Sequence, residues 1–191
     1  MPDFDPNKHH RRSIRLSNWD YQAPAAYFVT ICTHQREHLF DDPVWADAAK
    51  SAWQAIPGHT SRVLLDEWVL MPNHFHGILV LVDGTSGSIS TSPFDMRWAS
   101  QADDNPRPFA NAPSGSLGAV IRSYKAVVTR RINRMRQTPS GKVWQRGYYE
   151  RIIRNDRELE RIRAYILNNP ARWAAEPDDL NVLLTRMKLR G

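Results

Sequence analysis

Two histidines separated by one residue, His74 and His76, are the residues best placed to do chemistry. They follow a Met-Pro-Asn corner and lead into an apolar run (residues 78–82) whose composition predicts a buried strand. Side chains alternate between the two faces of a strand, so both imidazoles share one face and Phe75 takes the other. Their Cα atoms would lie about 6.6 Å apart, at about 3.3 Å per residue. Two imidazoles at this separation could bind one cation, although ordinary polar residues at the mouth of a strand give the same pattern.

A second pair of candidates lies on a helix predicted near the C-terminal end of the chain. Tyr165 and Asn169 are four residues apart, so they share one face of that helix, at about 40° from each other. A phenol and an amide oxygen placed in this way could reach one point together. The same spacing also suits a tyrosine packed in the core. Other tyrosines compete for the chemical role, namely Tyr124, Tyr148 and Tyr149.

The strands that must position the histidines are predicted from β-propensity and alternation. Residues 27–33 form a strong first strand, and residues 63–70 form another that is close enough to pair with the histidine strand as a hairpin. In the second of these we expect Leu64 and Trp68 on one face and Asp66 on the other.

Three longer helices are predicted from apolar stripes at helical spacing and from their capping residues. The first follows Asp41 or Asp42 and is stopped by Pro57-Gly58. The last is capped by Asn155 and ends by Pro170, because the residue before a proline disfavours helical geometry. A short helix is also expected at residues 177–184. The three longer helices span residues 43–56, 117–136 and 155–169.

These elements indicate an α+β fold in which antiparallel strands carry the histidines and the helices pack on one face of the sheet. We divide the chain into a basic N-terminal arm (residues 1–24), a main domain (residues 25–170) and a C-terminal tail (residues 171–191). The main domain holds an insertion at residues 83–116. Gly, Pro and Ser make up 14 of its 34 residues, which predicts a flexible segment without catalytic residues.

Composition narrows the class of protein. Of the 191 residues, 41% are hydrophobic, enough to build a core. No apolar run approaches the roughly 18 residues that span a bilayer, and the N-terminus lacks the apolar segment of a signal peptide. The single cysteine, Cys32, excludes an intrachain disulfide. We therefore expect a cytoplasmic protein.

Positive charge is concentrated in one part of the chain. The net charge is +6, and residues 117–163 hold 13 Lys and Arg against 4 Asp and Glu. This pattern favours a nucleic-acid partner, although solvated helix faces would produce it too. Trp144 and Tyr148 are candidates to stack on unpaired bases. The candidates for contacts with DNA are Arg11, Arg12, Arg15, Arg122, Lys125, Arg130, Arg146, Arg151 and Arg154.

The histidine pair, the Tyr165–Asn169 pair and the segments around them resemble those of the REP-associated tyrosine transposases, which belong to the single-tyrosine HUH transposase family. The resemblance covers most of the chain in the family's order. Its most specific feature is the joint occurrence of His-x-His and Tyr-(x)3-Asn-Pro after a Trp-Gln segment. The segments that carry it are residues 11–16, 26–33, 69–76, 143–154 and 165–170.

The resemblance implies a ferredoxin-like sheet and a metal-dependent enzyme that cleaves single-stranded DNA beside a hairpin. It implies that His74, His76 and Asn169 bind Mg²⁺ or Mn²⁺. Tyr165 is then the nucleophile, and it forms a covalent 5′-phosphotyrosine with the DNA. The protein would act as a monomer or a homodimer, with Tyr165 supplied by the same chain or by a partner.

Two other functions compete with this one. The first is a non-catalytic regulator that binds hairpin DNA or RNA, with structural histidines. The second is a metal-dependent hydrolase of small phosphoesters that uses water in place of tyrosine. The charge distribution argues against the hydrolase, and the spacing of Tyr165 and Asn169 favours the transposase over the regulator.

Overall fold

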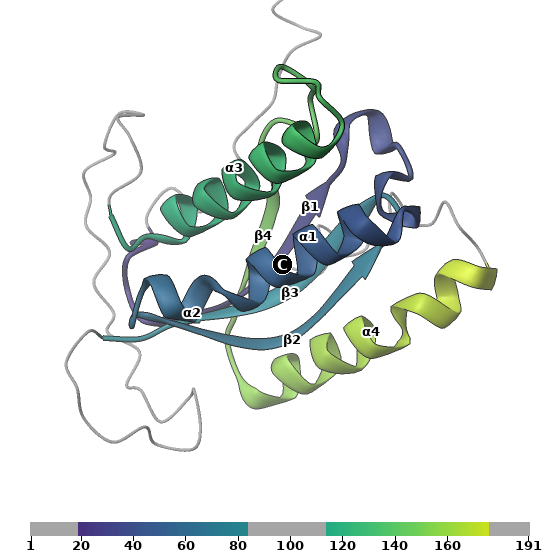
Figure 1. The fold of residues 1–191 in the computed structure, drawn as a ribbon. Coiled ribbons are helices and arrows are strands. Elements are labelled where there is room, and N and C mark those ends of the chain that lie inside the picture. The colour runs from purple at the N-terminus through teal and green to yellow at the C-terminus, as the bar shows by residue number, and fades with distance from the viewer. Residues whose placement is uncertain (1–18, 84–113, 176–191) are drawn as a thin grey trace, which may run out of the picture.

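A four-stranded antiparallel sheet, with strand order β2-β3-β1-β4, organises the protein. The structure is a computed structural model that describes residues 19–83 and 114–175. Figure 1 shows α1 and α3 lying across the front of the sheet. In chain order the elements are β1 (Ala25–Cys32), α1 (Pro43–Gln54), α2 (Ile56–His59), β2 (Val63–Met71), β3 (His74–Leu81), α3 (Leu117–Met135), β4 (Tyr149–Ile153) and α4 (Asp156–Ala175), with two short 3-10 turns, His34–Arg36 and Leu39–Asp41, between β1 and α1.

The two central strands, β1 and β3, run antiparallel with Ala25 opposite Leu81 and Cys32 opposite His74. Every residue of β3 is buried, as its apolar composition predicts. The predicted β2–β3 hairpin is confirmed, and its corner is held from both sides. The Phe40 amide donates to the Pro72 carbonyl, and the Thr33 amide donates to the Asn73 carbonyl.

Helices cover both faces of the sheet. The α+β class and the ferredoxin-like strand order are confirmed, and α1 and α3 share one hydrophobic core with Trp53, Phe75 and Ile121. The expectation that all helices pack on one face is wrong, because α4 forms a second core on the opposite face with Phe28 and Ile78. The physical reason is that the central strands are apolar on both faces, so each face needs a cover.

Strand β2 contains a β-bulge that separates side chains expected to lie together. Leu65 pairs with Leu79 but Trp68 pairs with Gly77, so three steps along β2 correspond to two along β3. The expectation that Leu64 and Trp68 share a face is therefore wrong. Leu64 packs in the core under α4, whereas Trp68 packs in the core under α1 and α3.

Two helix ends differ from the predictions, both at prolines. Pro57 lies in the first turn of α2, where its missing amide costs little, so it begins a short helix after α1 ends at Gln54. Pro170 lies inside α4 instead of ending it. The helix continues because Trp173, beyond the proline, packs against the rings of His38 and His74. The caps at Asp42 and Asn155 are confirmed.

Some predictions fall on residues that the structure does not describe. These are the arm residues Arg11, Arg12 and Arg15, most of the 83–116 insertion, and the short helix at residues 177–184. The division into arm, domain and tail remains a prediction, and α4 crosses its boundary at residue 170. No helix in the described part of the chain is both long and apolar enough to cross a membrane.

Candidate functional site

The two histidines lie together at the start of β3, on the face that α4 covers. His74 and His76 are 1% and 0% exposed, and their ring centroids are 4.6 Å apart. Phe75 points to the opposite face, into the core with Trp53. The predicted alternation is therefore confirmed, and it places two buried imidazoles side by side.

The corner before β3 orients the first imidazole. His74 Nδ1 lies 2.7 Å from Asn73 Oδ1, which can only accept, so Nδ1 carries the ring proton. His74 Nε2 is buried and has no hydrogen-bond partner among the described residues. An unpaired lone pair of this kind is unusual in a protein interior, and it marks a place where a ligand could bind.

The neighbouring strand orients the second imidazole. Thr30 lies opposite His76 in the β1–β3 pairing, and its Oγ1 is 2.8 Å from His76 Nδ1. The Phe28 ring stacks on His76 at 5.3 Å between centroids. Both Nδ1 atoms thus form hydrogen bonds to groups of the protein. This is the arrangement in which a hydrogen-bonded Nδ1 holds a histidine with Nε2 directed at a metal.

Helix α4 brings the predicted tyrosine to the histidines. The Tyr165 hydroxyl is 3.1 Å from His76 Nε2, and Asn169 Nδ2 donates to the same hydroxyl at 2.7 Å. A consistent set of bonds runs from the Asn169 amide to the Tyr165 oxygen, from the Tyr165 hydroxyl to His76 Nε2, and from His76 Nδ1 to Thr30. The expectation that Tyr165 faces the histidine strand is confirmed, within a single chain.

Burial keeps both imidazoles neutral. Burial, with the charge of Arg36, lowers the pKa of His74 to about 3. Burial, with the nearby His74, lowers the pKa of His76 well below its usual value. Neutral imidazoles are the form that ligates metals, so the chemistry of both side chains fits a cation.

The residues fit a divalent cation with two adjustments. His74 offers an unpaired Nε2 lone pair, whereas the Nε2 lone pair of His76 accepts from Tyr165 and would have to be released; Asn169 is the third polar group at the same place. Its amide nitrogen faces Tyr165, so a turn of the amide group would be needed to direct its oxygen to a metal. Residues 19–83 and 114–175 contain no cluster of three or more His, Cys, Asp or Glu that could form a different metal site.

Sequence reasoning missed three neighbours of the site: Thr30, Asn73 and Trp173. Thr30 is found only from the strand register. Trp173 lies four residues after Asn169, so the spacing of Tyr165, Asn169 and Trp173 places all three near one face of a continuous helix. The expectation that the helix ends at Pro170 excluded Trp173 from that face. The Trp173 ring is 5.5 Å from that of His74, between centroids.

The competing aromatic residues lie elsewhere. Tyr124 is 2% exposed and Trp144 is 8% exposed, and both belong to the core on the other face of the sheet. Trp144 is thus placed in the core, where it contacts Phe40 and Tyr124 instead of facing solvent as base stacking would need. Tyr148 packs against that core too, while Tyr149 packs on the α4 side.

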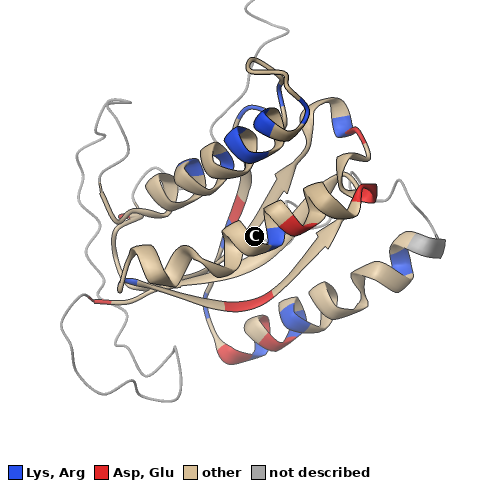
Figure 2. Ribbon diagram, viewed as in Figure 1, with Lys and Arg blue, Asp and Glu red and all other residues tan. Residues whose placement is uncertain are grey.

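The basic candidates fall into two groups. Two have internal partners: Lys125 Nζ donates to the carbonyls of Gln145 and Gly147, and Arg151 pairs with Glu158. Figure 2 shows that α3 carries basic residues and no acidic ones. The candidates that are exposed are Arg122, Arg130, Arg146 and Arg154.

Comparisons with known proteins agree with this fold. No protein-family model matches the chain. An uncharacterized protein of Haemophilus influenzae is 36% identical over 187 residues, covering 94% of this chain and 97% of that protein. A solved structure of a REP-associated tyrosine transposase bound to a REP hairpin has a TM-score of 0.53 and 17% identity, covering 85% of this chain and 73% of that one. The two chains therefore share a fold.

Proposed function

The chain belongs to one protein family with the Haemophilus influenzae protein, and from its fold and site we propose that it is a transposase that cleaves and rejoins single-stranded DNA. The observation that carries the proposal is the contact of the Tyr165 hydroxyl with His76 Nε2 at 3.1 Å. A phenol beside two neutral imidazoles suits covalent phosphoryl transfer better than it suits a structural core. The fold shared with the hairpin-bound transposase supports the same class of reaction.

In the proposed reaction Tyr165 is the nucleophile. Its oxygen forms a bond to phosphorus as the bond from phosphorus to the 3′ oxygen breaks. The phenol proton leaves to solvent, and the released 3′ oxygen takes up a proton. The product is a 5′-phosphotyrosine, and attack by a 3′-hydroxyl reverses the step without an external energy source.

The other site residues hold and orient the reacting groups. Asn169 donates to the Tyr165 oxygen and Thr30 holds the ring of His76. His74, His76 and Asn169 would hold Mg²⁺ or Mn²⁺. When bound, such a cation would polarise the phosphate and offset its charge.

The proposed substrate is single-stranded DNA beside a hairpin. The net charge of +6 and the excess of basic residues after residue 117 favour a polyanion. The solved structure of the related fold was bound to a REP hairpin. Three neutral ligand groups would leave a cation's charge uncancelled, which also suits an anionic phosphate.

The test is a covalent trapping experiment. The protein is incubated with Mn²⁺ and a pool of 3′-labelled hairpins with randomised single-stranded flanks, and the products are separated by denaturing electrophoresis. A 5′-phosphotyrosine would transfer the 3′ label to the protein. We expect a labelled band for the wild type and none for Tyr165→Phe or with EDTA.

Tyr148→Phe is the matched control, because Tyr148 is a half-buried tyrosine packed against the core on the other face. It should form the band as the wild type does. Binding of hairpins that is unaffected by EDTA and by Tyr165→Phe, without any covalent band, would instead support the non-catalytic regulator. Cleavage without a covalent band would support a water-using hydrolase.

A further inference from the structure

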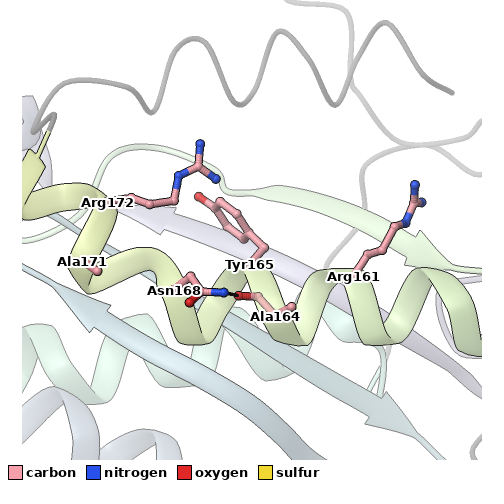
Figure 3. Close-up of a pocket in the computed structure, with 6 residues that line it drawn as sticks. All are labelled: Arg161, Ala164, Tyr165, Asn168, Ala171 and Arg172. Atoms are coloured by element: carbon pink, nitrogen blue, oxygen red, sulfur yellow. Dashed lines mark hydrogen bonds between the residues drawn. The ribbon is translucent and has the colours of Figure 1, made fainter.

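A groove of about 650 Å³ runs along the outer side of α4, beside the proposed nucleophile. Figure 3 shows that Arg161, Tyr165 and Arg172 project from the same side of the helix, with the tyrosine between the two arginines. The ring of Tyr165 lines this groove while its hydroxyl contacts His76. Tyr165 is therefore the residue that the groove and the site share. Its lining residues are Arg161, Ala164, Tyr165, Asn168, Ala171 and Arg172.

The three long side chains lie along one line of the helix. Positions 161, 165 and 172 fall within about 40° of each other at 3.6 residues per turn. The Cα atoms of Arg161 and Arg172 are separated by about 17 Å along the axis, at about 1.5 Å per residue. Several stacked nucleotides span this length, at about 3.4 Å each. A single strand along the groove could thus reach both arginines and pass Tyr165 between them.

The floor of the groove is formed by small or folded-back side chains. Ala164 and Ala171 are exposed and present only methyl groups. Asn168 turns back to its own helix, where its Nδ2 donates to the Ala164 carbonyl at 2.7 Å. The floor is therefore open for the sugar and backbone of a strand.

The charge of the groove is positive. None of its lining residues is acidic. The acidic neighbour Glu160 is directed away to Arg163, which also pairs with Asp66. Arg161 is exposed and makes no ion pair with any residue that the structure describes. The Arg172 guanidinium lies over the Tyr165 ring, 5.8 Å from its centroid.

We propose that this groove binds the single strand, with Arg161 and Arg172 on phosphates at either side of the one that Tyr165 attacks. The inference rests on the proposed function, since it takes Tyr165 as the nucleophile. It adds a binding site for two phosphates of the single strand. Arg172 did not stand out in the sequence, because its common line with Tyr165 depends on a helix that continues through Pro170.

The first test measures binding without catalysis. A fluorescein-labelled twelve-nucleotide oligothymidylate is titrated with protein at several salt concentrations, and anisotropy gives the dissociation constant. Each phosphate contact on a single strand contributes about 0.7 to the slope of log affinity against log salt. We expect Arg161→Ala and Arg172→Ala each to weaken binding about 5–10-fold and to reduce that slope by about 0.7.

Arg134→Ala is the matched control, because Arg134 is an exposed arginine on α3 across the sheet. It should bind the oligonucleotide as the wild type does. A steric variant gives an independent reading: Ala164→Leu fills the floor while keeping a good helix former. It should weaken binding at least 5-fold with unchanged thermal unfolding, whereas Ala126→Leu, at an exposed position of α3, should have no effect.

The experiments test the proposed groove and the proposed nucleophile separately. If Arg161→Ala and Ala164→Leu bind the oligonucleotide with wild-type affinity and salt slope, the groove is overturned, even if the wild type forms the covalent band. If these variants lose binding but no hairpin gives a covalent band, the groove stands and the proposed reaction fails.

Discussion

Hydrogen bonds to the Nδ1 atoms decide what the two site histidines can do. Asn73 Oδ1 accepts a hydrogen bond from the Nδ1–H of His74, and Thr30 Oγ1 lies 2.8 Å from Nδ1 of His76. Each partner comes from a well-anchored part of the sheet, one from the β2–β3 corner and one from the central strand β1. The rings therefore keep their orientation without a ligand, which limits the reorganisation needed when one binds.

We predict that Thr30→Val weakens metal binding. Valine has nearly the shape of threonine but cannot hydrogen bond to His76, so the ring loses its orientation. Removing such a partner typically lowers metal affinity or activity about 10–100-fold. Isothermal titration with Mn²⁺ measures the affinity directly, and the yield of the covalent band against Mn²⁺ concentration measures its consequence.

Thr129→Val is the control for that change, because Thr129 is a half-buried threonine on α3 across the sheet. Circular dichroism verifies that both variants fold. Wild-type affinity for Mn²⁺ in Thr30→Val would show that Thr30 does not orient a metal ligand.

The bulge in β2 and helix α4 are joined by a half-buried ion pair. Asp66, at the bulge, accepts from Arg163 Nε at 2.8 Å and from the Glu67 amide at 2.7 Å. Arg163 is two residues before Tyr165, so the ion pair helps to set how α4 lies over β3. Burial by itself raises the pKa of Asp66, but the hydrogen bond from Arg163, the Glu67 amide and the Arg163 charge together hold it below its usual value.

Because this ion pair joins β2 to α4, we predict that Asp66→Asn destabilises the protein in a pH-dependent way. The pKa of Asp66 is lower in the folded protein than in the unfolded chain, near 3.9. Its stabilisation is therefore fully present above about pH 4 and lost as the pH falls through the folded value. At pH 7 the variant should lose about 1–3 kcal/mol of unfolding free energy in urea titrations.

The difference between wild type and Asp66→Asn should shrink as the pH falls below about 4, because the wild-type carboxyl is then protonated as well. Asp47→Asn, at an exposed position of α1, should change stability little at either pH. A destabilisation that is equal at pH 7 and pH 3 would contradict a role for the Asp66 charge.

In the molecule as a whole, the sheet separates two basic surfaces. The groove with Arg161 and Arg172 lies on α4, and the exposed arginines Arg122 and Arg130 lie on α3 across the sheet. A short single strand held in the groove does not need α3. A hairpin stem is larger and carries two strands of phosphates, so it could contact α3 as well.

We predict that Arg122→Gln combined with Arg130→Gln weakens the binding of hairpin DNA about 10-fold. The slope of log affinity against log salt should fall by about 1.8, at about 0.9 per phosphate contact on duplex DNA. Binding of the twelve-nucleotide single strand should not change. Anisotropy titrations with a labelled hairpin and with the single strand measure both.

The control loses the same two charges elsewhere, through Lys50→Gln on α1 and Arg157→Gln on α4. It should keep most of the hairpin affinity. An equal loss of hairpin affinity in both double variants would mean that only net charge matters and that α3 holds no binding surface.

Local periodicity was enough to predict much of this protein from its sequence. Alternation along β3 placed His74 and His76 on one face, and the four-residue spacing placed Tyr165 with Asn169. Three of the four strands, β1, β2 and β3, and the caps of α1 and α4 followed from β-propensity, apolar patterns and capping residues. These features depend on neighbours in the chain, which a sequence displays directly.

How these elements pack together depends on contacts between residues that are distant in the chain. The register of β1 on β3 brought Thr30 to His76, and the bulge in β2 put Trp68 on the face opposite Leu64. Packing of Trp173 on His74 accompanies a helix that passes through Pro170, and α4 covers the face opposite α1 and α3. Register, bulges and the choice of face are set by contacts between residues far apart in the chain, and no local pattern encodes them.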